Sequence, residues 1–258
     1  MLAPNRKHRA LAATVVMTCL LFAAGCVDVL IPDAKVIFIA FGDSSTDGPT
    51  DRDYADILRE MLGQPPGTFA NEGQSGEETD EGADRLRDLL DMDIYPNAEV
   101  LLYWEGANDL ADWVGHRDSL LVFDPNSTAY PFADGMADKL DDIQENIETA
   151  IGLATDAGLD VYVATSIPIR EELSLCQAGS LLIATPIQAA HANAYIELLN
   201  ERIRQAASNE GATLVELTGV GEQLATDAAN FHDCTHLSAA GNEVVAGVFY
   251  NTLVAHGH

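Results

Sequence analysis

The sequence predicts an α/β fold, a three-layer α/β/α arrangement in which helices cover both faces of a parallel β-sheet. The first observation is a set of short apolar runs, rich in β-branched and aromatic residues, at 35–40, 99–104, 160–165 and 213–217. The second is that segments with helical periodicity separate these runs. Strands that alternate with helices along a chain are typical of parallel sheets covered on both faces.

Each element follows from its own pattern. The run KVIFIA (35–40) is apolar apart from its first residue, as expected for a strand buried on both faces, and it ends shortly before Gly42. The runs EVLLYW, DVYVAT and TLVEL repeat this character further along the chain. Helical spacing of apolar residues predicts helices over 51–62, 78–91, 135–157, 187–208 and 238–255. No clear period is visible in the segments 110–134 and 168–186, which are predicted to be loops over one end of the sheet.

The first 25 residues have the pattern of a secretory signal peptide. A basic segment (1–9) precedes an apolar run (10–24), and small residues follow. The apolar run is shorter than the roughly 20 residues that span a bilayer, which disfavours a retained transmembrane helix. The sequence Ala-Ala-Gly-Cys ending at Cys26 resembles the bacterial lipobox, although Ala23 stands where that box usually has leucine. Cys26 is therefore expected to carry lipid, and an ordinary signal peptide remains the alternative.

This interpretation divides the chain into a signal peptide (1–25), a short tether (26–34) and one domain (35–258). The domain is long enough for a single substantial core. We expect an exported bacterial lipoprotein of the cell envelope, at the outer membrane or the cell surface, because Val27 after the lipidated cysteine is not the aspartate that often marks inner-membrane retention.

The charge of the chain excludes some partners. The formal net charge is −28, and three of the 13 basic residues precede Cys26. The remaining 10 basic residues and 41 acidic residues give the mature chain a charge near −31. Such a field repels nucleic acid and anionic membrane surfaces.

Two cysteines remain after Cys26 and the leader are set aside, namely Cys176 and Cys234. An exported protein enters an oxidising compartment, where cysteines pair. We expect a disulfide between these two residues, with two free thiols as the alternative.

Polar segments gather where strands end and where the last helix begins. They are Gly42–Gly48, Asn71–Gly76, Gly106–Asp109 and Asp233–His236. In open α/β sheets the ligand crevice lies beyond the carboxyl ends of the strands. The four segments are therefore expected to meet at one site.

In this order, the four segments resemble the SGNH hydrolases, also called the GDSL lipase and esterase family. The resemblance extends from Lys35 to the last helix. It implies a flavodoxin-like sheet of about five parallel strands and a serine ester hydrolase that needs no cofactor. Its catalytic residues would be Ser44, Asp233 and His236.

The chemistry explains why these residue types occur together. A serine becomes nucleophilic when a base, usually histidine, removes its proton. A carboxylate on the other ring nitrogen sets the histidine tautomer and stabilises the imidazolium. Oxyanion donors are also required, and the resemblance assigns this role to the amides of Ser44 and Gly73 and to the side chain of Asn108. Asp109 is expected to hold the loop that presents Asn108.

Some residues depart from the family pattern or suggest another chemistry. Ser45 replaces the leucine of the GDSL block, and Glu105 has no role that the sequence reveals. His232 and His236 flank Cys234, but neither a His-Glu-x-x-His pattern nor a further ligand cluster accompanies them, so no metal site is predicted.

The substrate is predicted only by class, a small carboxylic ester. No long apolar segment near the site demands a fatty-acyl tunnel, which favours a short acyl chain. A lysophospholipase or thioesterase acting on longer chains is the alternative within the family. Outside enzymes, the alternative is a surface lipoprotein that binds a glycan or a partner without catalysis.

Overall fold

The computed structural model of the chain describes residues 32–50, 52–117, 135–170 and 186–258, and the backbone of the short strands 176–178 and 181–183. The predicted signal peptide, Cys26 and most of the tether lie outside the described residues. In the part of the chain that is described, no helix combines the length and hydropathy needed to cross a bilayer.

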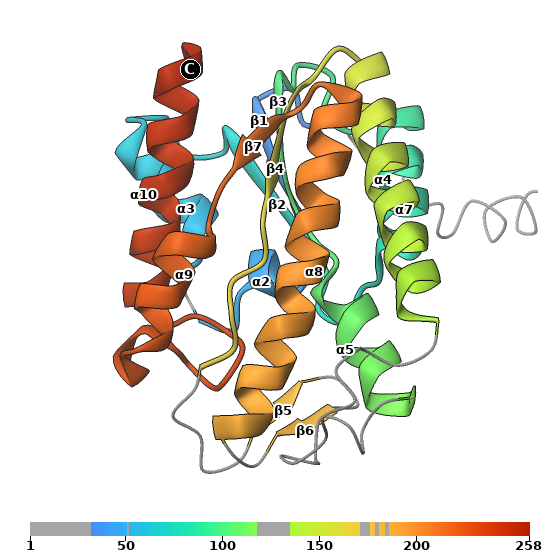
Figure 1. Cartoon of the computed structure of the whole chain (residues 1–258). Coiled ribbons are helices and arrows are strands. Elements are labelled where there is room, and N and C mark those ends of the chain that lie inside the picture. The colour runs from blue at the N-terminus through green and yellow to red at the C-terminus, as the bar shows by residue number, and fades with distance from the viewer. Residues whose placement is uncertain (1–31, 51, 118–134, 171–175, 179–180, 184–185) are drawn as a thin grey trace, which may run out of the picture. The chain divides into compact units, whose positions relative to one another are not determined.

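The central sheet has five strands, all parallel, in the order β2-β1-β3-β4-β7 (Figure 1). The strands are β1 (Phe38–Gly42), β2 (Phe69–Gly73), β3 (Val100–Trp104), β4 (Asp160–Ala164) and β7 (Thr213–Val215). The predicted parallel sheet with helices on both faces is therefore confirmed. A small antiparallel pair, β5 (Cys176–Ala178) and β6 (Leu181–Ile183), lies apart from it.

Successive residues of β1 point to opposite faces of the sheet, as the period of a strand requires. Ile39 and Phe41 belong to one hydrophobic core, and Phe38 and Ala40 belong to the other. The first core includes residues of α4 (Thr79–Asp91), α5 (Ala107–Arg117), α7 (Met136–Asp156) and α8 (Pro186–Glu210). The second includes residues of α3 (Tyr54–Met61), α9 (Thr218–Ala225) and α10 (Ala239–His256). The sheet thus separates two helical layers (Figure 1).

The structure contains elements that the sequence did not predict, among them α2 (Ser44–Asp47) and α9. Strand β2 (FANEG) is an edge strand with partly exposed residues, so it lacks the apolar run that identified the other strands. Helix α5 covers 107–117, so Asn108 lies at the start of a helix and not in the loop predicted to present it, and the helix continues into the predicted loop 110–134. The hairpin β5–β6 lies within the second predicted loop, 168–186.

Candidate active site

Ser44 occupies the first position of the short helix α2 (Ser44–Asp47), directly after β1. Asp43 caps this helix, because its Oδ1 accepts a hydrogen bond from the Ser45 amide at 2.7 Å. Gly42 lets β1 approach β3 closely, since a Cβ at Gly42 would lie 2.1 Å from the Trp104 carbonyl oxygen. Strand, glycine and cap together present the Ser44 side chain at the carboxyl edge of the sheet.

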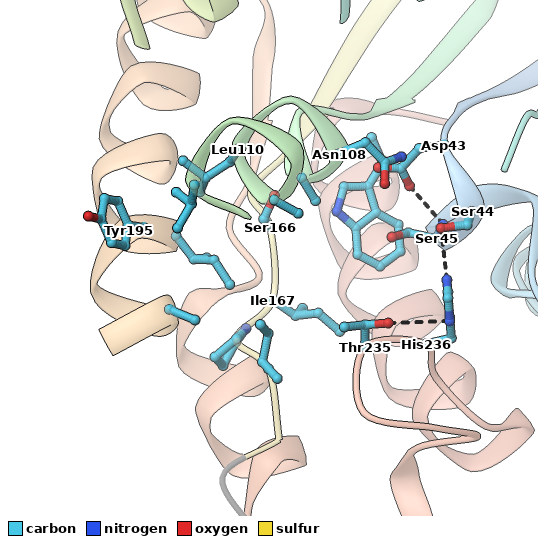
Figure 2. Close-up of a pocket in the computed structure, with 18 residues that line it drawn as sticks. Asp43, Ser44, Ser45, Asn108, Leu110, Ser166, Ile167, Tyr195, Thr235 and His236 are labelled. Atoms are coloured by element: carbon cyan, nitrogen blue, oxygen red, sulfur yellow. Dashed lines mark hydrogen bonds between the residues drawn. The ribbon is translucent and has the colours of Figure 1, made fainter. Parts of the chain in front are cut away.

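The structure brings Ser44, His236 and Asp233 together, although 192 positions separate Ser44 from His236. His236 Nε2 lies 2.9 Å from Ser44 Oγ, and His236 Nδ1 lies 2.7 Å from Asp233 Oδ2. Figure 2 shows the first of these contacts at one end of a pocket. One ring nitrogen can therefore accept the serine proton while the other donates to the carboxylate.

The loop before α10 holds this pair in place. Asp233 Oδ1 accepts hydrogen bonds from the amides of Thr235 and His236, both at 2.8 Å, so the aspartate folds its own turn. Its second oxygen stays directed at the histidine ring. The His232 amide closes the loop by donating to the His236 carbonyl at 2.9 Å.

The surroundings of Asp233 favour its charged form. Burial alone raises its pKa, but the hydrogen bonds from the His236 amide, the His236 ring and the Thr235 amide outweigh burial and hold the pKa below its usual value. The carboxylate is thus charged at neutral pH and can stabilise an imidazolium.

Asp43 is a second acid close to the nucleophile, and its environment is the opposite one. It is 2% exposed, and burial raises its pKa to about 6, against the lowering influence of the Ser45 hydrogen bonds and of His236. The neighbouring Asp109 raises this pKa further. Its observed contact is with α2, so its role in the site is to hold the helix that carries Ser44.

Asn108 lies at the start of α5 and lines the same pocket as Ser44. Its Nδ2 donates to the Glu77 carbonyl at 3.0 Å, which leaves its second amide hydrogen for another acceptor. The adjacent Asp109 is buried and accepts from the Thr79 amide at 2.8 Å and from Lys139 Nζ at 3.1 Å. These contacts fix the start of α5, as expected for Asp109 from the sequence.

Gly73 does not provide the predicted amide donor. Its N–H donates to Asn71 Oδ1 at 2.9 Å, and a Cβ at this position would lie 2.0 Å from the Asp47 nitrogen. Gly73 therefore allows β2 to pack against α2. Its amide hydrogen is already donated to Asn71 and is not available to an oxyanion. The prediction that this amide stabilises an oxyanion is wrong.

The turn that follows β2 offers a different amide. The Glu77 amide donates to the Gln74 carbonyl at 3.2 Å, and Gly76 between them has a φ of +87°. A turn with positive φ at its third residue is of type II, and its own hydrogen bond does not use the third amide. The Gln74 amide ties the turn to the Gly42 carbonyl at 2.8 Å, and Glu77 receives Asn108. Gly76 thus lies in the turn between Gln74, which is bonded to the end of β1, and Glu77, which is bonded to Asn108. The Ser75-Gly76 pair is a turn signal that the sequence shows.

A pocket of about 130 Å³ extends from Ser44 and His236. Figure 2 shows Ser44 and His236 at one end and Leu110 and Tyr195 toward the other. Its walls come from α5, from the segment after β4 and from α8, and most of them are aliphatic: Leu110, Ala111, Val114, Ile167, Ile169, Ala192 and Ile196. These residues are scattered over three segments, so the sequence did not reveal the pocket.

Two further sequence predictions concern histidine and cysteine. Among the described residues, no group of three or more histidine, cysteine or acidic side chains is arranged to hold a metal ion. Cys234 is buried in the catalytic loop, and Cys176 begins β5, but the side chain of Cys176 lies outside the described part of the chain. The disulfide therefore stays a prediction.

Comparison with known proteins agrees with this arrangement. The model of the GDSL-like lipase/acylhydrolase family matches residues 40–244. No curated protein matched the chain in sequence.

Solved structures resemble the chain in fold. An acetyl xylan esterase, AlAXEase, is 20% identical with a TM-score of 0.55, covering 84% of this chain and 100% of its own. LAE5, an α/β hydrolase from the metagenome of Lake Arreo, is 16% identical with a TM-score of 0.58, covering 89% and 99%. A mutant of Axe2, an acetyl-xylooligosaccharide esterase from Geobacillus Stearmophilus, is 17% identical with a TM-score of 0.56, covering 84% of this chain and 94% of its own.

Proposed function

Because this chain belongs to the GDSL-like lipase/acylhydrolase family, we propose that it is a serine esterase that hydrolyses carboxylic esters through an acyl-Ser44 intermediate. The observation that carries the proposal is the chain of contacts from Ser44 Oγ to His236 Nε2 at 2.9 Å and from His236 Nδ1 to Asp233 at 2.7 Å. Nucleophile, base and orienting carboxylate are the three parts that acyl transfer requires.

In the proposed mechanism, His236 removes the proton of Ser44 as the Oγ attacks the ester carbonyl carbon. His236 then returns this proton to the departing alcohol. A water molecule, deprotonated by the same histidine, releases the acid and restores Ser44. The amides of Ser44 and Gly76 and the side chain of Asn108 stabilise the oxyanion of each tetrahedral intermediate.

The pocket supports a short acyl chain as substrate. A dry cavity of about 150 Å³ with apolar walls accepts a molecule the size of benzene, and the aliphatic pocket beside Ser44 has a comparable volume of about 130 Å³. An acyl chain of about four to six carbons would fill such a space. Each methylene placed there is worth about 0.8 kcal/mol, which favours such chains over acetate.

A series of p-nitrophenyl esters from acetate to palmitate tests this preference. We expect kcat/KM to be highest at butyrate or hexanoate. Ala192→Leu, which fills the pocket from α8, should lower kcat/KM for hexanoate by roughly tenfold relative to acetate. Ala190→Leu adds the same side chain to an exposed position of α8 outside the pocket and should leave the preference unchanged. A maximum at palmitate would contradict the proposal and favour the lysophospholipase alternative, while a Ser44-dependent maximum at acetate would point to an acetyl esterase.

We also propose that the chain is exported as a lipoprotein, anchored through Cys26, with Cys176 and Cys234 paired. The proposal is supported by the leader and lipobox pattern and by the position of Cys234 in the loop that carries Asp233 and His236. A bridge there would tether the catalytic loop.

Mass spectrometry of the exported protein checks both modifications. We expect an N-terminus at Cys26 that carries lipid, and Cys26→Ser should release the protein to the soluble fraction or stall its processing. Peptides containing Cys176 and Cys234 should be linked before reduction. An unmodified N-terminus elsewhere would rule out the anchor, and alkylation of both cysteines without reduction would rule out the bridge.

A further inference from the structure

Glu105 is a buried acid that the proposed mechanism does not use. It follows β3 directly, is 2% exposed, and accepts a hydrogen bond on Oε2 from the Tyr103 hydroxyl at 2.8 Å. Within the described residues, no N–H or hydroxyl donor reaches its Oε1. Gly82 of α4 packs against this carboxyl so closely that a Cβ at Gly82 would lie 2.4 Å from Oε2. Among the residues that the structure describes, none forms an ion pair with this buried carboxyl, since the nearby Arg85 pairs with Glu77 and Glu72 instead.

Glu77, the acid next to Glu105, forms an ion pair with Arg85. The Glu77 side chain is 1% exposed, and its two oxygens accept from Nε and Nη2 of Arg85, each at 2.6 Å. The Arg85 guanidinium also donates to the Glu72 carbonyl at 2.9 Å and lies 3.9 Å above the centre of the Phe41 ring. A bidentate, charge-assisted pair of this kind places the Arg85 cation on Glu77 rather than on Glu105.

Two buried carboxyl groups in contact cannot both be charged. Burial is the main cause that raises the pKa of Glu105 well above its usual value, and the hydrogen bond with Glu77 raises it further. A raised pKa favours the protonated form of Glu105, and the proton of a neutral Glu105 carboxyl can be donated to Glu77. A carboxyl group held neutral by an apolar site acts as such a donor.

Glu77 connects this pair to the oxyanion side of the site. Its carbonyl accepts Asn108 Nδ2 at 3.0 Å, and its amide closes the turn that contains Gly76. Any movement of the Glu77 backbone would therefore shift both proposed oxyanion donors. We propose that Glu105 is a positioning residue: its neutral carboxyl holds Glu77, and Glu77 in turn fixes Asn108 and the Gly76 turn for oxyanion stabilisation. This inference rests on the proposed esterase function.

Two substitutions at Glu105 separate positioning from packing. Glu105→Gln keeps a neutral group that can donate to Glu77 and accept from Tyr103, so kcat should stay within about twofold of wild type. Glu105→Leu keeps most of the volume but removes the donor, and kcat should fall by between about tenfold and 10²-fold with KM unchanged, since small displacements of positioned groups have costs of this size. A fall of more than tenfold in Glu105→Gln, or a rise in KM alone in Glu105→Leu, would overturn the proposal.

A double-mutant cycle with Asn108→Ala tests the route of the effect. Asn108→Ala alone should lower kcat by about 10² to 10³. If Glu105 acts largely through Asn108, adding Glu105→Leu to this variant should lower kcat by only a further few-fold. This remaining loss would come from the effect of Glu105 on the Gly76 turn. Independent, multiplicative losses would sink the positioning role while leaving the esterase function intact. Absence of Ser44-dependent hydrolysis in the wild type would instead defeat the proposed function itself. Should Glu105→Leu fail to fold, the Glu105→Gln result decides alone.

Discussion

Replacing Ser44 by alanine is expected to lower kcat for ester hydrolysis by about 10⁴ to 10⁶, because the variant has no oxygen to form the acyl intermediate. The fold should persist. The side chain of Ser44 contacts His236, whereas the cap that starts α2 comes from Asp43 and the Ser45 amide. Purified Ser44→Ala should therefore match the wild type in thermal unfolding and differ only in turnover on the preferred p-nitrophenyl ester.

Ser45→Ala is the matched control for this variant. Ser45 is the next residue of α2 and lines the same pocket. Alanine retains the backbone amide that donates to Asp43 and removes only the hydrogen bond that the Ser45 side chain adds. Turnover of Ser45→Ala should stay within a few-fold of wild type. Equal losses in the two variants would mean that α2, rather than the Ser44 hydroxyl, accounts for the effect.

Replacing Asp233 by asparagine is expected to lower kcat by about 10⁴. Asparagine retains an oxygen that can accept from the amides of Thr235 and His236, so the catalytic loop should keep its conformation. Its NH₂ group, however, would face His236 Nδ1, where the carboxylate oxygen lies 2.7 Å away in the wild type. The imidazole would then carry its proton on Nε2 and could not accept the proton of Ser44.

Kinetics of Asp233→Asn separate this effect from substrate binding. KM should change little, because Asp233 does not line the pocket, while kcat falls. Thr235→Val, which removes the hydroxyl 3.3 Å from His236 Nδ1 but keeps the amide that donates to Asp233, serves as the control and should lose less than tenfold. Turnover of Asp233→Asn close to that of the wild type would show that His236 needs no carboxylate partner.

The central strands could be predicted because burial on both faces leaves an uninterrupted apolar run. Strands β1 and β3 are buried at every position, and their sequences show it. Strand β2 lies at the sheet edge, where partial exposure permits Asn71 and Glu72, so its pattern is weak. Helix α5 begins inside a polar motif whose residues serve the site, which hides the start of the helix.

The residues of the proposed triad could be identified because each follows a structural boundary and carries a distinctive chemistry. The oxyanion donors were harder to identify, since a backbone amide has no side chain to mark it. Gly73 and Gly76 both lie in the second motif, and only the hydrogen bond of Gly73 to Asn71 and the positive φ of Gly76 distinguish them. Glu105 had no visible role because its partner Glu77 comes from another segment of the chain.

The most direct measurement of the central claim is the site at which a fluorophosphonate, an analogue of the tetrahedral intermediate, modifies the protein. Peptide mass spectrometry should place the label on Ser44, with loss of esterase activity in proportion to labelling. Ser44→Ala should stay unlabelled, and Asp233→Asn should react far more slowly, because Ser44 needs the same base for both reactions. Labelling of another residue, or continued ester hydrolysis with Ser44 fully modified, would contradict the proposed mechanism.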